Sequence, residues 1–375
     1  MLPKLIAGTP GIAPAATPEP SSQSAAQRSD HQERPADAVG SSLPDALRQS
    51  RPRRTRSSST SAVAAPHPSL SSDDLALAAY LLARDIDGRR VFQPEMDRLR
   101  KANESVGNTR RVLKFGRGNV GTDLRATGNE SRFRTKAARQ LKAELYMRGG
   151  GRFVAYAEQM QHSTTAATVL GSGNCGEYTS VTSIRHSSRL DAGETVHYVT
   201  SAGHGHAWAE ARVPADDVSG ASTIVMDGWA KGPAVLAPDS RFAANRGQVE
   251  SQVQLDAATG REARVATNDL ILELRAKGPA ETQRRVRQST TWTARLAAVI
   301  DDALLPLGLG GHWAEQPVLS DAFAARVRAR LTLTANADLL ARAKRIATEF
   351  GVAVPESTAQ AHRIISATLE LIALR

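Results

Sequence analysis

Apolar positions in this chain recur with a helical period near its two ends and with a strand period in its middle. Over residues 75–86, and again through most of the chain after Asn268, apolar residues stand three and four positions apart, which is the spacing of one helix face. Residues 194–201 and 204–213 instead alternate at every second position, and an apolar run ending at Met226 follows them. The pattern predicts an α+β fold in which helices surround a small antiparallel sheet.

Start and stop signals place the boundaries of the predicted helices. Ser72 with Asp73 and Asp74 is a favourable first turn, because the hydroxyl caps free N–H groups and the acids suit the positive end of the helix dipole. Gly88 ends this helix, and the chain turns helical again from Asn268. Further helices are expected over 94–102, 132–146 and 153–160, with a loop-rich segment over 236–265.

Composition narrows the classes of partner. The chain has 375 residues of which 4% are aromatic, so its core must consist mainly of Ala, Leu and Val. A net charge of +10 favours anionic partners, but no nucleic-acid-binding motif accompanies it, and no specific nucleic acid is expected. A single cysteine excludes an internal disulfide and fits a reducing environment. No apolar run approaches the roughly 20 residues that span a bilayer.

The stretch from Gly171 to Pro233 concentrates the residues that can carry chemistry. It holds the only cysteine and four of the nine histidines. Cys175 stands in the loop GSGNCG, which we expect to open a helix, and the positive end of that helix favours the reactive thiolate. Small neighbours leave room for a substrate carbonyl, and the Cys175 N–H, Asn174 and Gly176 are candidate oxyanion or substrate contacts. The alternative is a buried structural cysteine, against which the polar, glycine-rich context argues.

A histidine on the predicted sheet and an aspartate at a strand end complete a candidate triad. We predict His206 as the base, with His204 less favoured, and Asp227 as the group that orients the ring. Trp208, on the same strand face, and Trp229, just after Asp227, are candidate substrate contacts. The other nearby aspartates stand in predicted polar turns: Asp191, Asp216 and Asp217.

A metal site is the competing interpretation of the same strand. The spacing His204-x-His206-x-x-x-Glu210 fits half of a cupin motif, in which two imidazoles and a carboxylate bind iron, manganese or zinc. No second half-motif with a later histidine is present, and His312 stands in a different context. We therefore expect no metal at the triad and keep cupin-like metal chemistry as an alternative.

A cluster of basic residues precedes the cysteine. Glycines break the segment 109–125, and N–H groups freed by glycines, with cations beside them, can hold phosphates. The segment has no Walker lysine-serine pair and no clear strand before it, so a solvated loop that packs near the site is the alternative. The cations concerned are Arg110, Arg111, Lys114, Arg117 and Arg125.

Three motifs together resemble a known family: GNCGEY around Cys175, HAWAE around His206 and DGWAKGP from Asp227. They resemble the transglutaminase-like, papain-like cysteine fold and, more narrowly, the HopX/AvrPphE/XopE effectors that plant-pathogenic bacteria deliver by type III secretion. The resemblance implies a Cys-His-Asp triad, a host protein substrate, and a region ahead of the cysteine that contacts a host target or cofactor. Some members look like acylated membrane proteins. Here Leu2 replaces the glycine that N-myristoylation requires, so at most peripheral membrane contact is expected.

Composition and resemblance divide the chain into four expected regions. Residues 1–70, rich in Ser, Pro, Ala and Thr and without aromatics, are expected to form a disordered secretion or targeting arm. A basic helical region should follow over 71–165, then a transglutaminase-like catalytic core over 166–265 and a packed helical region over 266–375. The expected location is the host cell after secretion (cytoplasm, nucleus or membrane surface), and a type III chaperone is a candidate partner.

These features predict a thiol enzyme that transfers an acyl group of a host protein. Protease, deamidase and transglutaminase remain open, because all three share the first half-reaction. A phosphate-rich host molecule bound at residues 110–125 is a candidate activator, and no other cofactor is expected. The alternative is a non-catalytic protein that binds a host target through its basic surface and helical C-terminal part.

Overall fold

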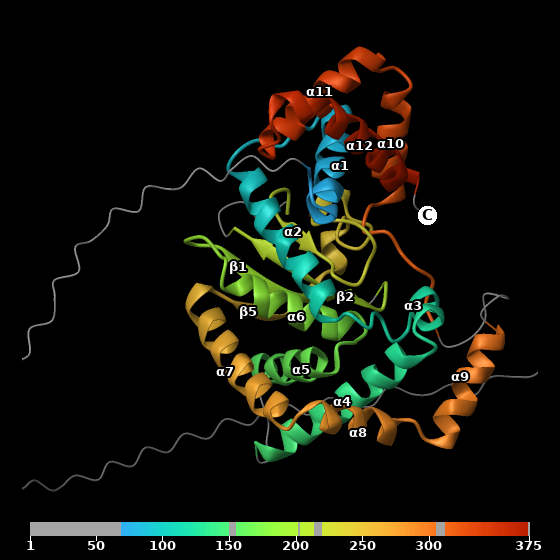
Figure 1. The fold of residues 1–375 in the computed structure, drawn as a ribbon. Helices are drawn as coiled ribbons and strands as arrows, with labels where there is room; N and C mark the ends of the chain where they lie inside the picture. Colours follow the sequence, from blue (N-terminus) through green and yellow to red (C-terminus); the bar gives the residue numbers. More distant parts are fainter. Residues whose placement is uncertain (1–68, 150–154, 202, 214–219, 305–311, 374–375) are drawn as a thin grey trace, which may run out of the picture. The chain divides into compact units, whose positions relative to one another are not determined.

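An antiparallel sheet of five strands lies at the centre of the part of the chain that the structure describes (Figure 1). The computed structural model describes residues 69–149, 155–201, 203–213, 220–304 and 312–373. The strand order is β4-β3-β2-β1-β5, which confirms the predicted α+β class. The strands are β1 (Thr195–Ser201), β2 (His206–Arg212), β3 (Ile224–Met226), β4 (Val235–Leu236) and β5 (Glu250–Leu255). The arm expected over residues 1–70 lies, but for its last two residues, outside the described chain.

The register of the sheet brings distant parts of the sequence to one edge. β1 and β2 form a hairpin in which Ser201 pairs with His206, and β3 pairs antiparallel with β2 through Ala209 and Met226. Because β2 and β3 run in opposite directions, the residue that follows β3 lies near the start of β2. That residue is Asp227.

Helices pack against the sheet and against one another (Figure 1). α6 contacts β1 and β2, α5 contacts α6 and α7, and α1 packs with α11 and α12. The helices that build the central part are α1 (Ser72–Ile86), α2 (Glu95–Val112), α3 (Gly121–Ala126), α4 (Glu130–Arg148), α5 (Tyr156–Leu170) and α6 (Cys175–Ser187). The later helices are α7 (Ala257–Ala276), α8 (Pro279–Ser289), α9 (Trp292–Leu304), α10 (Asp321–Leu331), α11 (Asn336–Glu349) and α12 (Val354–Ala373).

Helix α6 is buried on several sides although its sequence is polar. The hydroxyls of Thr179, Ser180 and Thr182 donate to backbone carbonyls one turn earlier at 2.7, 2.9 and 2.9 Å. Their polar groups are therefore satisfied within the helix, and the small side chains let α2, α5 and the sheet approach closely. The helix that begins at Cys175 is thus fixed by packing from several directions.

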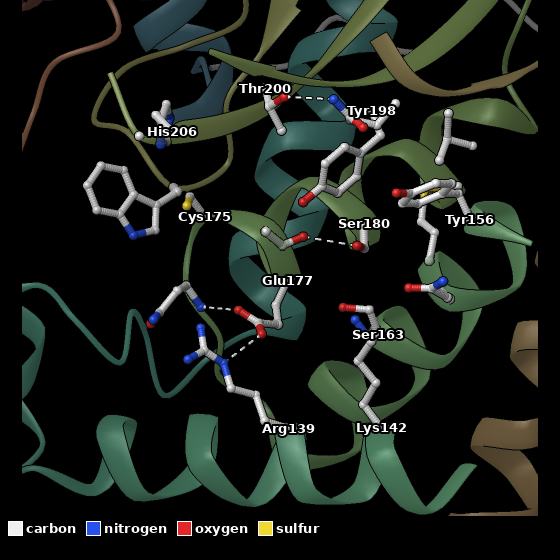
Figure 2. A pocket seen from close by; sticks show the side chains of 18 of the residues that line it. Arg139, Lys142, Tyr156, Ser163, Cys175, Glu177, Ser180, Tyr198, Thr200 and His206 are labelled. Atoms are coloured by element: carbon white, nitrogen blue, oxygen red, sulfur yellow. Dashed lines mark hydrogen bonds and ion pairs between the residues drawn. The ribbon is translucent and has the colours of Figure 1, made fainter. Parts of the chain in front are cut away.

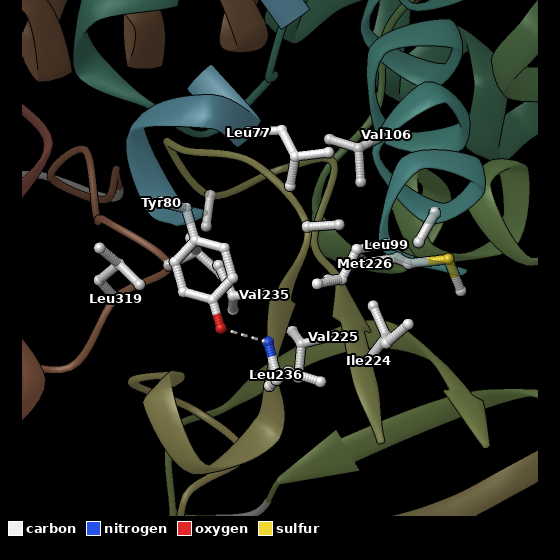
Figure 3. Close-up of a cluster of buried hydrophobic side chains, with 14 of the residues drawn as sticks. Leu77, Tyr80, Leu99, Val106, Ile224, Val225, Met226, Val235, Leu236 and Leu319 are labelled. Atoms are coloured by element: carbon white, nitrogen blue, oxygen red, sulfur yellow. Dashed lines mark hydrogen bonds between the residues drawn. The ribbon is translucent and has the colours of Figure 1, made fainter. Parts of the chain in front are cut away.

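The core cluster of Figure 3 joins α1 and α2 to β3 and β4. Leu77 and Tyr80 of α1 are fully buried, and each buried side chain of this size contributes roughly 1.5–3 kcal/mol. The Tyr80 hydroxyl accepts a hydrogen bond from the Leu236 N–H at 2.9 Å and donates to Asp239 Oδ2 at 2.8 Å. Arg84 pairs with the same carboxylate oxygen at 2.8 Å, so α1 is joined to the end of β4 by a buried polar network.

Several predicted boundaries are wrong, and in α2 and α5 the reason is that buried Ser and Thr residues resemble loop residues in the sequence. α2 continues to Val112 rather than stopping at residue 102, since its buried Ser and Thr residues bond back to the helix. α5 continues through its Ser- and Thr-rich second half to Leu170. The segment expected to be loop-rich contains β4 and β5 and the start of α7, whose first turn is capped by the Asp256 carboxylate.

The expected division into regions does not coincide with separate compact units. Residues 63–375 cluster as a single unit, of which the structure describes the part from residue 69 onward. The divisions expected at 165 and 265 fall inside α5 and α7. The helices α10, α11 and α12 contact α1, so the two ends of this unit share one core.

Candidate active site

Cys175 is the first residue of α6, as the sequence predicts. The preceding helix ends at Gly171, whose φ of 74° lies in the left-handed region that glycine adopts without strain. A Cβ atom at Gly173 would lie 2.4 Å from the Glu177 Cβ, so the tight loop also requires a glycine there. The loop leaves Cys175 half-buried at the helix N-terminus, where the dipole favours a thiolate.

His206 and Asp227 form a buried pair at the edge of the sheet. His206 Nε2 lies 2.6 Å from Asp227 Oδ2, and both side chains are almost completely buried. Asp227 Oδ1 accepts hydrogen bonds from the N–H groups of Trp229 and Ala230 at 3.0 and 2.9 Å. Since Asp227 occupies Nε2, the nitrogen of His206 that remains for another partner is Nδ1.

The electrostatics of the pair favour its charged form. Burial lowers the pKa of His206, but the charge and hydrogen bond of Asp227, together with Cys175, outweigh burial and raise that pKa to about 10. Burial raises the pKa of Asp227, but His206 and the two N–H donors outweigh it, so the pKa of Asp227 is lowered. An imidazolium beside a carboxylate is therefore the stable state near neutral pH.

Cys175 and His206 line one cavity of about 470 Å³ (Figure 2), and Cys175 is among the groups that raise the pKa of His206. The fold thus brings together all three residues of the predicted triad from α6, β2 and the turn after β3. The sulfur, the imidazole and the carboxylate stand in the order that proton transfer from a thiol requires. Their participation in catalysis stays a prediction.

Polar and aromatic side chains form the rest of the cavity wall. Tyr198 and Ser180 lie near Cys175, and Lys142, Tyr156 and Ser163 line the part farther from the sulfur (Figure 2). Burial, with smaller contributions from the nearby Cys175 and Glu177, raises the pKa of Tyr198, so its hydroxyl stays protonated. The cavity is large enough for an amino-acid side chain and offers it both hydroxyl groups and a cation.

Asn174 and Gly176 line the cavity on either side of Cys175, as expected. The Asn174 N–H donates to Glu177 Oε2 at 2.8 Å, so that backbone donor is already used. Trp229 also lines the cavity, and its ring centroid lies 5.0 Å from that of His206. It is only 2% exposed, which makes it a wall of the site rather than a projecting contact.

The expectation that Trp208 contacts a substrate is wrong. Its side chain is fully buried, and Nε1 donates to Glu210 Oε1 at 3.0 Å. The Trp208 ring stacks against the His206 ring with centroids 5.9 Å apart. The centroids of the Phe242 and His206 rings are 4.4 Å apart. Trp208 and Phe242 therefore pack against the His206 ring; Phe242 is a contributor that the sequence analysis missed.

The geometry does not favour the metal-binding alternative. β2 begins at His206, so His204 lies in the preceding turn, where its Nδ1 is 3.2 Å from the Ser201 hydroxyl. Glu210 is surrounded by cations, with Arg246 at 2.6 Å and Arg212 at 2.6 Å. Among the described residues, no group of three or more His, Cys, Asp or Glu side chains is placed to hold a metal ion.

Two of the predicted anion-binding arginines instead hold the turn that contains Asp227. Arg110 donates to the carbonyls of Gly228, Ala230 and Gly232 at 3.1, 2.7 and 2.7 Å, and more weakly to that of Asp227 at 3.3 Å. Burial lowers the pKa of Arg110, since no carboxylate contacts the guanidinium directly. The turn is thereby fixed by one buried cation.

Arg117 completes this support from the other side. It donates to the Trp229 carbonyl at 2.8 Å and pairs with Asp123 and Glu315, each at 2.8 Å. Burial opposes the charge, yet these hydrogen bonds raise the pKa of Arg117. Carbonyl groups of the turn thus accept from two fixed guanidinium groups, while its N–H groups donate to Asp227.

The other predicted anion contacts are dispersed. Arg111 pairs with Asp73, and Arg125 is exposed on the short helix α3. Lys114 lies over the Phe115 ring at 5.3 Å and lines a smaller cavity of about 330 Å³ together with Arg110 and Arg117. The predicted residues therefore do not form one site, and Lys114 is exposed at that cavity, as is Lys231.

Residues 312–320, from the C-terminal part of the chain, contact two loops of the site, and no sequence pattern predicts these contacts. The Trp313 N–H donates to the Asn119 carbonyl at 2.6 Å, and the Lys231 N–H donates to the Gln316 carbonyl at 2.8 Å. The Val318 N–H returns a bond to the Lys231 carbonyl at 2.9 Å. Residues 312–320 therefore connect the loop before α3 to the turn after Asp227, although no sequence periodicity links these segments.

The His206–Asp227 pair predicts a pH-dependent contribution to stability. A histidine whose pKa is raised to about 10 stabilises the fold fully below its ordinary value of about 6.5 and loses that contribution as the pH rises through 10. Asp227, with a lowered pKa, contributes above its ordinary range and loses the contribution in acid. We expect Asp227→Asn to lower the free energy of unfolding by about 3–5 kcal/mol at pH 6, with the difference shrinking toward pH 10.

Urea unfolding of both proteins at pH 6, 8 and 10 measures this difference. Asp191→Asn is the matched control, because Asp191 forms an exposed ion pair with Lys101 that should contribute less than about 1 kcal/mol. A difference for Asp227→Asn that does not change between pH 6 and pH 10 would contradict the charged-pair description.

The arrangement around Arg110 predicts a second effect. Arg110→Ala leaves several carbonyls of the turn without donors, so we expect a loss of about 3 kcal/mol or more in the free energy of unfolding. Faster hydrogen exchange should appear at the Trp229 and Ala230 amides, which donate to Asp227. The adjacent Arg111→Ala removes an exposed pair with Asp73 and an exposed hydrogen bond to Asn108 Oδ1, and should cost about 1 kcal/mol or less. Equal exchange of the turn amides in both variants would show that Arg110 does not hold the turn.

No helix among the described residues is long and apolar enough to cross a membrane. No protein-family model, curated protein or solved structure matches the chain. At the site, the half-buried thiol of Cys175 and the buried imidazole of His206 line one cavity, and the buried carboxylate of Asp227 contacts the imidazole.

Proposed function

We propose that the protein is a cysteine-dependent acyl-transfer enzyme with a transglutaminase-like core. The observation that carries the proposal is the juxtaposition of Cys175 and His206 at one cavity, with Asp227 2.6 Å from the far nitrogen of the ring. A purely structural cysteine has no need of a buried imidazole–carboxylate pair beside it. A helix that presents the thiol to a strand-borne histidine also supports the narrower comparison with the transglutaminase-like superfamily.

The first half-reaction follows from the positions of the three side chains. In the resting enzyme the thiol proton is already held on His206 Nδ1, and the electron pair of the Cys175 thiolate forms a bond to a carbonyl or carboxamide carbon. The π pair of that carbonyl moves to its oxygen and returns when the carbon–nitrogen bond breaks. His206 gives its proton to the departing nitrogen, which leaves as an amine or ammonia, and Cys175 is left as a thioester.

The second half-reaction decides the enzyme class. Water or an amine attacks the thioester carbon, His206 takes the proton of the attacking group, and the carbon–sulfur bond breaks. Water gives a protease or a deamidase, and an amine gives a transglutaminase. Asp227 holds the ring in place and stabilises the imidazolium throughout, which its two backbone donors allow it to do as a fixed anion.

The biological setting proposed for this activity is that of a type III effector delivered into plant cells. Support comes from the motifs GNCGEY, HAWAE and DGWAKGP in one chain, in the order that resembles the HopX/AvrPphE/XopE family. A host protein is the proposed substrate, and its modification would alter the host's immune response. The alternative of a protein that only binds a host target makes no use of the fixed triad geometry.

Alkylation of the single cysteine tests the proposal directly. Because the chain has one cysteine, every iodoacetamide adduct seen by intact-mass spectrometry belongs to Cys175. An ordinary thiol is only roughly 0.3% thiolate at pH 6, so fast alkylation there requires a base that keeps the thiolate. We expect the wild-type protein to react at least about 10-fold faster at pH 6 than His206→Ala.

The matched control is His204→Ala, which removes the neighbouring histidine that lies in the turn and contacts Ser201. It should react at the wild-type rate. Equal, slow alkylation of the wild-type protein, His206→Ala and His204→Ala would refute the enzyme proposal and leave a structural cysteine.

A further inference from the structure

Asn119, which no sequence motif identifies, lines the same cavity as the proposed nucleophile. The segment before α3 runs parallel to the loop before α6: Arg117 pairs with Gly173, and the Gly118 N–H donates to the Gly173 carbonyl at 3.0 Å. Asn119 stands two residues beyond Arg117, and Cys175 stands two residues beyond Gly173. Both residues line the same cavity.

The side chain of Asn119 is held in one orientation. Trp229 Nε1 donates to Asn119 Oδ1 at 3.1 Å, and an indole nitrogen can only donate, so the oxygen of the amide must face Trp229. The backbone is fixed as well, because the Asn119 carbonyl accepts from the Trp313 N–H at 2.6 Å. The amide nitrogen, Nδ2, is thereby turned away from Trp229, and no hydrogen bond from it is found within the described chain.

Asn119, Trp229 and Cys175 all line the 470 Å³ cavity. The Cys175 N–H belongs to the first turn of α6, where backbone donors have no acceptor within the helix. One side-chain donor and one backbone donor are therefore available beside the sulfur. An oxyanion that forms when the thiolate attacks a carbonyl needs such preorganised donors close to the attacked carbon.

We propose that Asn119 is a catalytic residue whose Nδ2 group, with the Cys175 N–H, binds the oxyanion of the tetrahedral intermediate; this rests on the acyl-transfer function proposed above. As the carbon–sulfur bond forms, the carbonyl π pair becomes the negative charge on oxygen, and the two donors stabilise it. As the leaving nitrogen departs, the pair returns to the carbonyl and the two hydrogen bonds weaken. Trp229 is a positioning residue in this scheme, because it orients the amide.

Two other groups of the cavity could compete for this role. The Tyr198 hydroxyl lies over Gly176, since a Cβ atom there would be 3.1 Å from it. Asn174 is the residue before the nucleophile, and its backbone N–H already donates to Glu177 Oε2. Neither group has its orientation fixed by a donor-only partner as Asn119 has.

Two probes that differ in their need for an oxyanion site separate these roles. p-Nitrophenyl acetate acylates a thiolate through a tetrahedral intermediate, whereas iodoacetamide alkylates it at a saturated carbon and forms no oxyanion. We expect Asn119→Ala to slow acylation of Cys175 by about 100- to 1000-fold, the usual effect of losing one oxyanion donor. Its alkylation rate at pH 6 should stay within about twofold of the wild-type rate, since the His206–Asp227 pair is intact.

Gln252→Ala is the matched control, because this amide lines the same cavity but its Nε2 already donates to Thr200 at 3.1 Å. It should acylate at the wild-type rate. Tyr198→Phe and Asn174→Ala test the rival donors, and each is expected to lose much less acylation than Asn119→Ala. Circular dichroism and urea unfolding establish that each variant is folded before the rates are compared.

The outcomes separate this proposal from the proposed function. Unchanged acylation by Asn119→Ala, or a larger loss in Tyr198→Phe or Asn174→Ala, overturns the assignment of Asn119 while the enzyme proposal stands. An equal loss of acylation and alkylation in Asn119→Ala also overturns it, because Asn119 would then act on the thiolate rather than on the oxyanion. Slow alkylation of the wild-type protein, independent of His206, is instead the failure of the proposed function.

Discussion

The hydrogen bond between His206 and Asp227 is buried, and much of the surrounding structure is arranged to keep that pair charged and aligned. A carboxylate removed from water needs several donors, and Asp227 receives three: the imidazole and two backbone N–H groups of its own turn. The turn can supply those N–H groups only if its carbonyls are held on the other side. Arg110 and Arg117 do this, so a chain of hydrogen bonds runs from buried arginines through a backbone turn to the imidazole.

This arrangement explains why segments far apart in the sequence meet at the site. The arginines come from the end of α2 and the loop after it, the thiol from α6, the imidazole from β2, and residues 312–320 close the back. Two of the basic residues that suggest a ligand-binding surface in the sequence, Arg110 and Arg117, instead hold the turn that contains Asp227. Lys114 is exposed and lines the smaller cavity, together with the exposed Lys231.

Local signals in the sequence are sufficient to predict the central elements and to select three residues, Cys175, His206 and Asp227, that the fold brings to one place. The α+β class, the two alternating strands before Asp227 and the helix that opens at Cys175 follow from alternation and from the positions of glycines, which are properties of neighbouring residues. The second strand, β2, begins at His206 rather than at the expected residue 204. The wrong helix ends in α2 and α5 have a shared cause, because buried Ser and Thr residues that bond back to their own helix look like loop residues. Alternation along β2 predicts that His206 and Trp208 share one strand face, but it does not predict whether a side chain on that face reaches a cavity or the core. The prediction that Trp208 contacts a substrate is wrong for this reason, since Trp208 is fully buried. No sequence pattern identifies Asn119 or residues 312–320, because only the tertiary structure brings Asn119 and Trp313 to the cavity that Cys175 lines.

The state of the His206 ring is the most direct test of this account. In protein labelled with ¹⁵N-histidine, the ring signals of His206 are assigned as those that disappear in His206→Gln, and they are followed by NMR from pH 5 to pH 10. The account predicts a ring protonated on both nitrogens up to at least about pH 8 in the wild-type protein, and loss of the proton at lower pH in Cys175→Ala, where the sulfur no longer helps to hold the charge. A ring that is neutral at pH 7 in the wild-type protein, or a titration that Cys175→Ala leaves unchanged, would contradict it.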